Sequence, residues 1–178
     1  MAAGRVSVRP AEPADLPLLV EIERRAGRLF AEHGLPEIAA DDPGTAEELE
    51  PYRAAGAAWV AADEGDLPVA YILTAEIDDG AHIEQVSVDP DHAGHGIGAA
   101  LIDHVAAVAA AAGLRALTLT TFRDIPWNAP YYARLGFVEL PEAGWGPQLR
   151  ALVALERHVI PSEAPRVAMI RPVEVPGT

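Results

Sequence analysis

The stretch IEQVSVDPDHAGHGIGAALIDHVAAVAA, residues 83–110, decides the fold of this chain. It opens with a run rich in Val and Ile, which is typical of a strand. It then passes through Gly94-His95-Gly96-Ile97-Gly98 and continues with Leu101, Val105 and Val108 at helical spacing among alanines, the best helix formers. The stretch therefore predicts a strand, a glycine-rich turn and a helix that begins at the turn.

The glycine turn is a candidate anion site. The first N–H groups of a helix have no intrahelical partner, and they lie at the positive end of the helix dipole. We therefore expect a phosphate group to bind there, helped by His92, His95 and Arg123. The alternative is a glycine-rich strand-to-helix turn that binds nothing.

The same residues also satisfy the dinucleotide pattern G-x-G-x-x-A through Gly94, Gly96 and Ala99. That pattern expects an acidic residue about 20 positions later to hold a ribose. Residues 114–121 contain no Asp or Glu, and the turn follows a series of hairpins rather than opening the fold. The context therefore argues against a dinucleotide site.

Upstream of the turn, the sequence predicts a strand at 6–9 and a helix over 16–30, followed by an acidic segment, 36–66. In that segment Thr45 and Glu48 have the spacing of a capping box for a short helix. Residues 57–62, 68–77 and 82–88 read as strands joined by turns at 64–66 and 78–80. Because Asp-Gly supplies positive φ angles, we expect these strands to form an antiparallel meander.

Downstream, the helix ends at Gly113 and a strand follows at 116–121. Asn128 can cap a short helix that Gly136 stops. Residues 137–140 and 149–158 are expected to be the last two main strands, and in the tail from Pro161 residues 166–173 could add an edge strand. The expected fold class is α/β: a single domain over 1–178 with a mixed, mostly antiparallel twisted sheet of six to eight strands and helices on both faces.

The amino-acid composition excludes several classes of binding partner and of catalytic chemistry. The 178 residues carry 27 acidic and 13 basic side chains, a formal charge of −14, which opposes binding to nucleic acid or to anionic lipid. Every basic residue is Arg and Cys is absent, so Schiff-base chemistry, a Walker lysine, thiolate catalysis and disulfides are excluded. No His pair has metal-site spacing, so no metal is expected. The N-terminal residues lack the apolar core of a signal peptide, and no apolar run could cross a membrane, so we expect a cytoplasmic protein.

Two separated motifs carry a family resemblance. Val86-Ser87-Val88-Asp89-Pro90 with the glycine turn, and the segment NAPYYARLGF from Asn128 to Phe137, together resemble the GCN5-related N-acetyltransferase (GNAT) family. The resemblance implies that acetyl-coenzyme A (acetyl-CoA) is the co-substrate. It implies the following cofactor-binding residues: Val86, Ser87, Val88, Ala93, Gly94, His95, Gly96, Ile97, Gly98, Ala99, Asn128 and Tyr132. Ala93 departs from the Gln or Arg that is usual in the family at this position, so one side-chain contact to phosphate is missing.

The resemblance also implies two catalytic residues. Glu84 matches the family's general base, and Tyr132 matches the residue that protonates the departing sulfur. A partly desolvated Glu84 would have a pKa raised toward the working pH, which suits a base. The alternatives are an exposed or Arg-paired Glu84, a Tyr132 packed in the core, and an Asn128 that only caps its helix. His82 could assist the base or be structural.

The function that we expect is direct transfer of an acetyl group from acetyl-CoA to a primary amine, on a small molecule or a peptide N-terminus. The acidic segment 36–66 could attract a cationic acceptor or could be an ordinary solvated surface. A homodimer is left open. Two other hypotheses are a catalytically weak acyl-CoA binding or sensing module on the same fold, and a structural domain that binds no nucleotide.

Overall fold

The computed structural model describes residues 6–160 and 162–174. Met1–Arg5, part of the N-terminal segment in which no signal peptide is expected, lie outside the described residues, as does Pro161, where the tail begins. Within the described residues, seven strands form one sheet in the order β1-β2-β3-β4-β5-β7-β6. The pairs β1–β2, β2–β3, β5–β7 and β6–β7 are antiparallel and β4–β5 is parallel, which confirms the mixed, mostly antiparallel α/β fold. Over the described ranges, no helix combines the length and apolar character needed to cross a bilayer.

The chain divides into two compact units, and each is described by itself. The first holds residues up to Thr74 and Gln85–His104. Its elements are β1 (Ser7–Pro10), η1 (Pro13–Asp15), α1 (Leu16–Gly27), α2 (Leu29–Glu32), α3 (Pro36–Ala39), α4 (Ala46–Ala54), β2 (Ala58–Ala62), most of β3 (Pro68–Ile77), the end of β4 (Gly80–Val88), η2 (Pro90–His92) and the first half of α5 (Ile97–Ala111).

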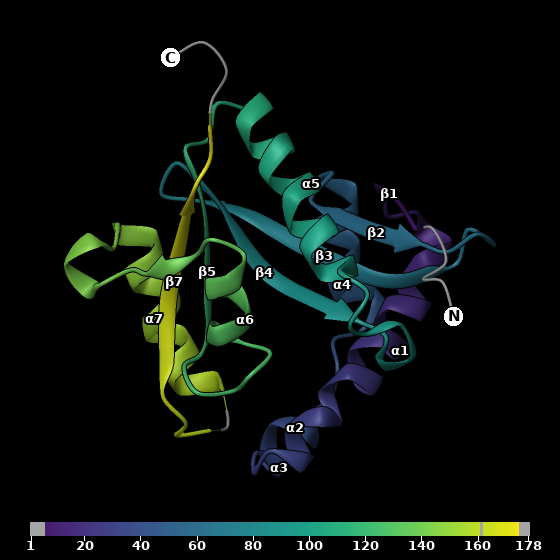
Figure 1. Ribbon diagram of the computed structural model, residues 1–178, viewed down its shortest axis with the longest axis horizontal. Helices are drawn as coiled ribbons and strands as arrows, with labels where there is room; N and C mark the ends of the chain where they lie inside the picture. Colours follow the sequence, from purple (N-terminus) through teal and green to yellow (C-terminus); the bar gives the residue numbers. More distant parts are fainter. Residues whose placement is uncertain (1–5, 161, 175–178) are drawn as a thin grey trace. The chain divides into compact units, whose positions relative to one another are not determined.

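The core of the first unit lies between α1, α4 and strands β2 and β3. Leu19 and Ile22 of α1 and Leu49 of α4 are buried against Val60 and Tyr71 of the strands. The buried α1 residues recur at helical spacing and so lie on one apolar face of the helix. Alternate residues of a strand point to the same side of the sheet, which gives the strands an apolar face as well. Figure 1 shows α1 continuing into α2 and α3 at one end.

Helix α4 confirms the predicted capping box. The Glu48 amide donates to Thr45 Oγ1 at 3.3 Å, and the Thr45 amide donates to Glu48 Oε2 at 2.8 Å. These bonds satisfy two backbone donors at the helix start and fix where the helix begins in the acidic segment.

The second unit holds residues Ala75–Glu84 and Val105–Thr178. Beyond its parts of β3, β4 and α5, its elements are β5 (Ala116–Phe122), α6 (Ala129–Arg134), β6 (Val138–Glu139), η3 (Glu142–Gly144), α7 (Pro147–Val159) and β7 (Arg166–Pro172). Strands β4 and β5 pair through Ala81 with Leu117 and His82 with Thr118.

The turn between β3 and β4 differs from the Asp-Gly turn that the sequence predicts. The positive φ angles fall on Asp78 (48°) and Asp79 (62°), and Gly80 is the first residue of β4. Asp tolerates this backbone region better than most residues. Gly80 is needed for a different reason, since a Cβ there would lie 3.1 Å from the backbone oxygen of Ala116.

The prediction of a strand at 149–158 is wrong, because this segment forms helix α7. Pro147 stands in its first turn, and Leu149, Leu152 and Val153 recur at i, i+3 and i+4, a helical spacing that the short apolar run obscured. The Asp78 carboxylate caps the helix by accepting from the amides of Gln148 (3.0 Å) and Leu149 (2.8 Å). The residue that fixes the helix start thus lies about 70 positions away in the sequence.

The expected edge strand in the tail is an interior strand. β7 pairs with β5 along its whole length, from Ala116 opposite Pro172 to Phe122 opposite Arg166, and its other side pairs with β6. Figure 1 shows β7, in yellow, running beside β5. Val167, Ala168 and Met169 are buried, as expected for a strand with neighbours on both sides.

Candidate active site

In the first unit, the predicted glycine turn joins η2 to the start of α5. Gly94 and Gly96 have φ angles of 78° and 74°, and a Cβ at either position would meet nothing within 4 Å. Residues 93–96 are exposed, and Ala100 makes the first helical bond from the turn, to Gly96 O at 3.0 Å. The amides from Gly94 to Ala99 therefore precede the helical ladder, whereas the Ala93 amide already donates to Pro90 O at 3.2 Å. Successive amides with positive φ angles among them are the kind of backbone that can bind an anion.

The segment before the turn is held by Asp89, which is 8% exposed. Asp89 Oδ1 accepts from the Asp91 amide at 2.9 Å, and Asp89 O accepts from the His92 amide at 2.8 Å. His95, one of the expected phosphate ligands, is exposed with Nδ1 3.2 Å from His92 O. His92 Nδ1 is buried and has no hydrogen-bond partner.

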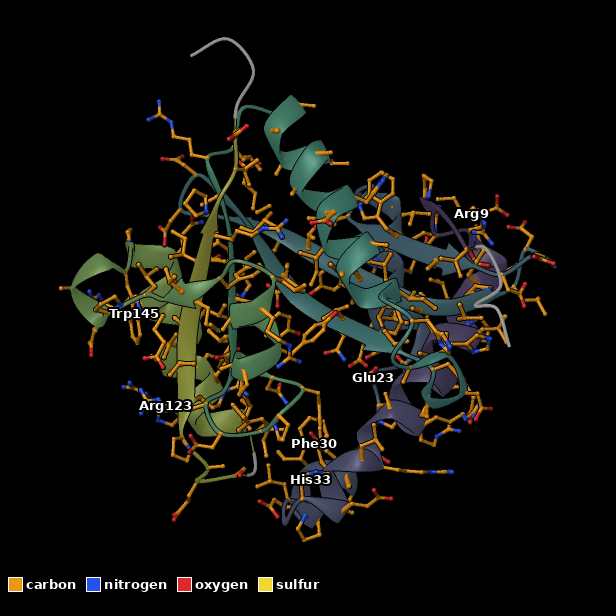
Figure 2. All side chains as sticks on the ribbon, viewed as in Figure 1. Arg9, Glu23, Phe30, His33, Arg123 and Trp145 are labelled. Carbon is orange, nitrogen blue, oxygen red and sulfur yellow. The ribbon has the colours of Figure 1, made fainter. Side chains whose placement is uncertain are left out.

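Strand β4 leads into this segment with Val86 and Val88 half-buried and Ser87 buried. The Ser87 hydroxyl accepts from Gln85 Nε2 at 2.8 Å and bonds to the Tyr71 hydroxyl. Tyr71 in turn donates to Glu23 Oε2 at 3.2 Å; Glu23 is labelled in Figure 2. Burial raises the pKa of Glu23. The Ser87 hydroxyl is thus already engaged in a hydrogen-bond network within the protein.

In the second unit, Glu84 is exposed, yet the protein that surrounds one side of its carboxyl group raises its pKa, and the negative charge of Glu156 adds to the effect. Glu156 accepts from Thr120 Oγ1 at 2.6 Å and lies 3.6 Å from Arg166 Nη2. Sequence reasoning missed Glu156 because it placed this residue on a strand. The helical spacing of Leu149, Leu152 and Val153 was the signal that could have found it.

Asn128 and Tyr132 lie together at α6, and the Tyr132 amide donates to Asn128 O at 3.0 Å. Tyr132 is 9% exposed and packs edge-to-face on Phe137, with ring centroids 5.8 Å apart. Burial raises the pKa of its phenol, so Tyr132 stays protonated at neutral pH.

The expectation that the Asn128 side chain caps the helix is wrong. Its Oδ1 instead accepts from Thr121 Oγ1 at 2.5 Å, and its Nδ2 is buried without a hydrogen-bond partner. A buried donor without a partner is costly, so this amide is well suited to a ligand acceptor atom.

His82 is structural. It is 1% exposed, its Nδ1 lies 2.8 Å from Thr118 Oγ1, and burial lowers its pKa to about 4. Arg123, expected to help bind phosphate, is exposed and pairs with Glu139 at 3.4 Å (Figure 2).

Both candidate regions fall within one match to a family model. Residues 22–137 match the Acetyltransferase (GNAT) family. The chain belongs to the GNAT acetyltransferase family. The matched range contains the glycine turn, Glu84, Asn128 and Tyr132.

Solved structures share the GNAT fold at low sequence identity. The ribosomal-protein-S18-alanine N-acetyltransferase from Escherichia coli is 20% identical, with a TM-score of 0.65 and 97% of each chain covered. Rv2747 from Mycobacterium tuberculosis, in complex with CoA and NLQ, is 22% identical with a TM-score of 0.69, covering 94% of this chain and 99% of that one. The PaiA N-acetyltransferase from Thermoplasma acidophilum, in complex with coenzyme A, is 14% identical with a TM-score of 0.66, covering 94% and 99%.

Proposed function

We propose that this GNAT protein transfers an acetyl group from acetyl-CoA to a primary amine, on a small molecule or a peptide N-terminus, by direct attack. The observation that carries the proposal is the exposed turn at the start of α5, where Gly94 and Gly96 adopt positive φ and leave amides for the pyrophosphate. In an acidic chain without Lys, such backbone donors are the natural means of holding an anion.

The residues proposed to hold acetyl-CoA contribute mainly through the backbone. Main-chain groups of Val86, Ser87 and Val88 would bind the pantetheine arm, and those of residues 94–99 would bind the pyrophosphate. The Ala93 amide, expected to belong to this set, instead donates to Pro90 O at 3.2 Å. The unpartnered Nδ2 of Asn128 is the one side-chain donor of the set that burial leaves unsatisfied. Ala93 offers no side-chain donor, so affinity depends on the turn amides.

The chemistry requires two proton movements. Glu84 takes the proton that the attacking amine loses as the nitrogen–carbon bond forms, and its raised pKa suits that role near neutral pH. The phenol of Tyr132 gives a proton to the sulfur as the carbon–sulfur bond breaks, since burial keeps it protonated. A main-chain N–H of Val86 or Val88 would stabilise the charge that develops on the carbonyl oxygen.

A thermal melt with acetyl-CoA and with NAD tests the proposal. At 100 times its Kd, a ligand stabilises the folded state by about 2.7 kcal/mol, which in a chain of this size raises Tm by roughly 5–10 °C. We expect this shift with acetyl-CoA and none with NAD. No shift with acetyl-CoA overturns the proposal.

Turnover separates an enzyme from a binding module. Release of free CoA thiol, measured against a panel of primary amines, should follow sequential kinetics, because direct attack needs both substrates bound together. A thermal shift with no thiol release across the panel would support the sensing module instead, and ping-pong kinetics would contradict direct attack.

A further inference from the structure

Arg25 on α1 makes two ion pairs with the segment that precedes the glycine turn. Its Nη1 donates to Asp89 Oδ2 at 2.6 Å and its Nη2 donates to Asp91 Oδ2 at 2.7 Å. One guanidinium thus spans two carboxylates that lie 64 and 66 positions further along the chain. All three residues belong to the first unit, as does the turn.

The two carboxylates are badly placed for an anion site unless they are neutralised. Asp91 precedes Gly94 by three residues, which span at most about 10 Å, close to the Debye length of about 8 Å at physiological ionic strength. Asp91 is exposed, whereas Asp89 is buried and receives the Asp91 amide at 2.9 Å. Their combined negative charge would repel a pyrophosphate at the neighbouring amides.

Asp89 has a structural role that requires a carboxylate near the glycine turn. Its carboxylate and carbonyl fold the η2 turn through the amides of Asp91 and His92, and its own amide donates to Val69 O at 2.8 Å. Asp89 therefore holds the conformation of the η2 turn, which leads into the glycine turn. Arg25 neutralises the negative charge that Asp89 places there. Consistently, Arg25 lowers the pKa of Asp91.

We propose that Arg25 is a positioning residue for coenzyme A binding: it ties α1 to the η2 turn and neutralises Asp89 and Asp91, so that the amides after Ala93 can donate hydrogen bonds to a pyrophosphate. This inference rests on the proposed function. It adds a residue outside both sequence motifs to the determinants of CoA affinity.

Isothermal titration calorimetry with coenzyme A tests the role without relying on turnover. Arg25→Gln should raise the Kd for coenzyme A roughly 5- to 20-fold, because two negative charges near the turn become uncompensated. Arg24→Gln is the matched control: Arg24 is the adjacent arginine, exposed and paired with Glu21 on its own helix, and its Kd should stay within twofold of wild type.

A second substitution distinguishes a loss of affinity caused by uncompensated charge from a loss caused by disturbed folding. Arg25→Gln combined with Asp91→Asn should recover most of the lost affinity, since the exposed carboxylate is removed along with its counter-charge. Equal Kd values for Arg25→Gln and Arg24→Gln, or a loss that Asp91→Asn does not relieve, overturn the charge-balancing role. If wild type itself binds no coenzyme A, the proposed function fails and takes this inference with it. If wild type binds and Arg25→Gln binds equally well, only the inference fails.

Discussion

Replacing Gly96 by Ala tests the glycine turn with a magnitude that follows from the structure. At φ 74° a Cβ would meet nothing within 4 Å, so the cost of the substitution is conformational, about 1–2 kcal/mol for an L-residue in the left-handed region. In a chain of this size, that cost lowers Tm by about 2–8 °C. If the turn relaxes to escape the strain, its amides no longer converge on one anion.

The expected effect on binding is larger than the effect on stability. Losing one hydrogen bond to a charged ligand costs about 1.5–3 kcal/mol, so the Kd for coenzyme A should rise about ten- to a hundredfold. Gly56→Ala is the matched control, because Gly56 follows α4 in the same unit, has φ 70°, and a Cβ at that position would likewise meet nothing within 4 Å. It should lose the same stability and keep wild-type affinity.

Calorimetric titration with coenzyme A and a thermal melt on both variants supply the two measurements. A Gly96→Ala variant that binds coenzyme A as tightly as Gly56→Ala, while both lose similar stability, would contradict this prediction. That outcome would mean that the turn conformation has no part in holding the ligand.

Four further predictions concern single side chains. Glu84→Gln should lower kcat/KM by about 10²- to 10⁴-fold at neutral pH. Glu156→Gln should move the acid limb of the pH–kcat/KM profile to lower pH, because removing the like charge lowers the pKa of Glu84. An acid limb at the same pH as in wild type would contradict this coupling between Glu84 and Glu156. Tyr132→Phe should reduce kcat by about 10- to 100-fold with little change in the Kd for coenzyme A, measured by steady-state kinetics and titration. His82 has a folded-state pKa of about 4 against about 6.5 when unfolded, so the unfolded chain binds the proton first and wild type should lose roughly 3 kcal/mol of stability as pH falls from 6.5 to 4. Urea melts of His82→Asn should lack this loss, and an identical pH dependence in both proteins would show that His82 is not its source.

Features whose causes lie within a few residues of the chain could be predicted from the sequence alone. The strand, glycine turn and helix of 83–110, the capping box of Thr45 and Glu48, and the end of the short helix before Gly136 were all predicted. Each follows from local periodicity, a side chain that reaches a backbone group three residues away, or a backbone angle that glycine adopts at little cost.

Features that depend on partners far away in the chain could not be predicted from the sequence and became visible in the folded structure. The segment 149–158 is a helix whose start is capped by Asp78, and β7 is an interior strand because β5 and β6 pair with its two sides. The Asn128 side chain bonds to Thr121 and does not cap its helix as expected. Arg25 pairs with Asp89, which lies 64 positions away in the sequence. Short apolar runs satisfy helix and strand periods equally well, and a polar side chain bonds to whichever partner folding brings within reach. The packing between distant segments determines which secondary structure forms and which partner a side chain bonds to, and a local sequence pattern holds no information about that packing.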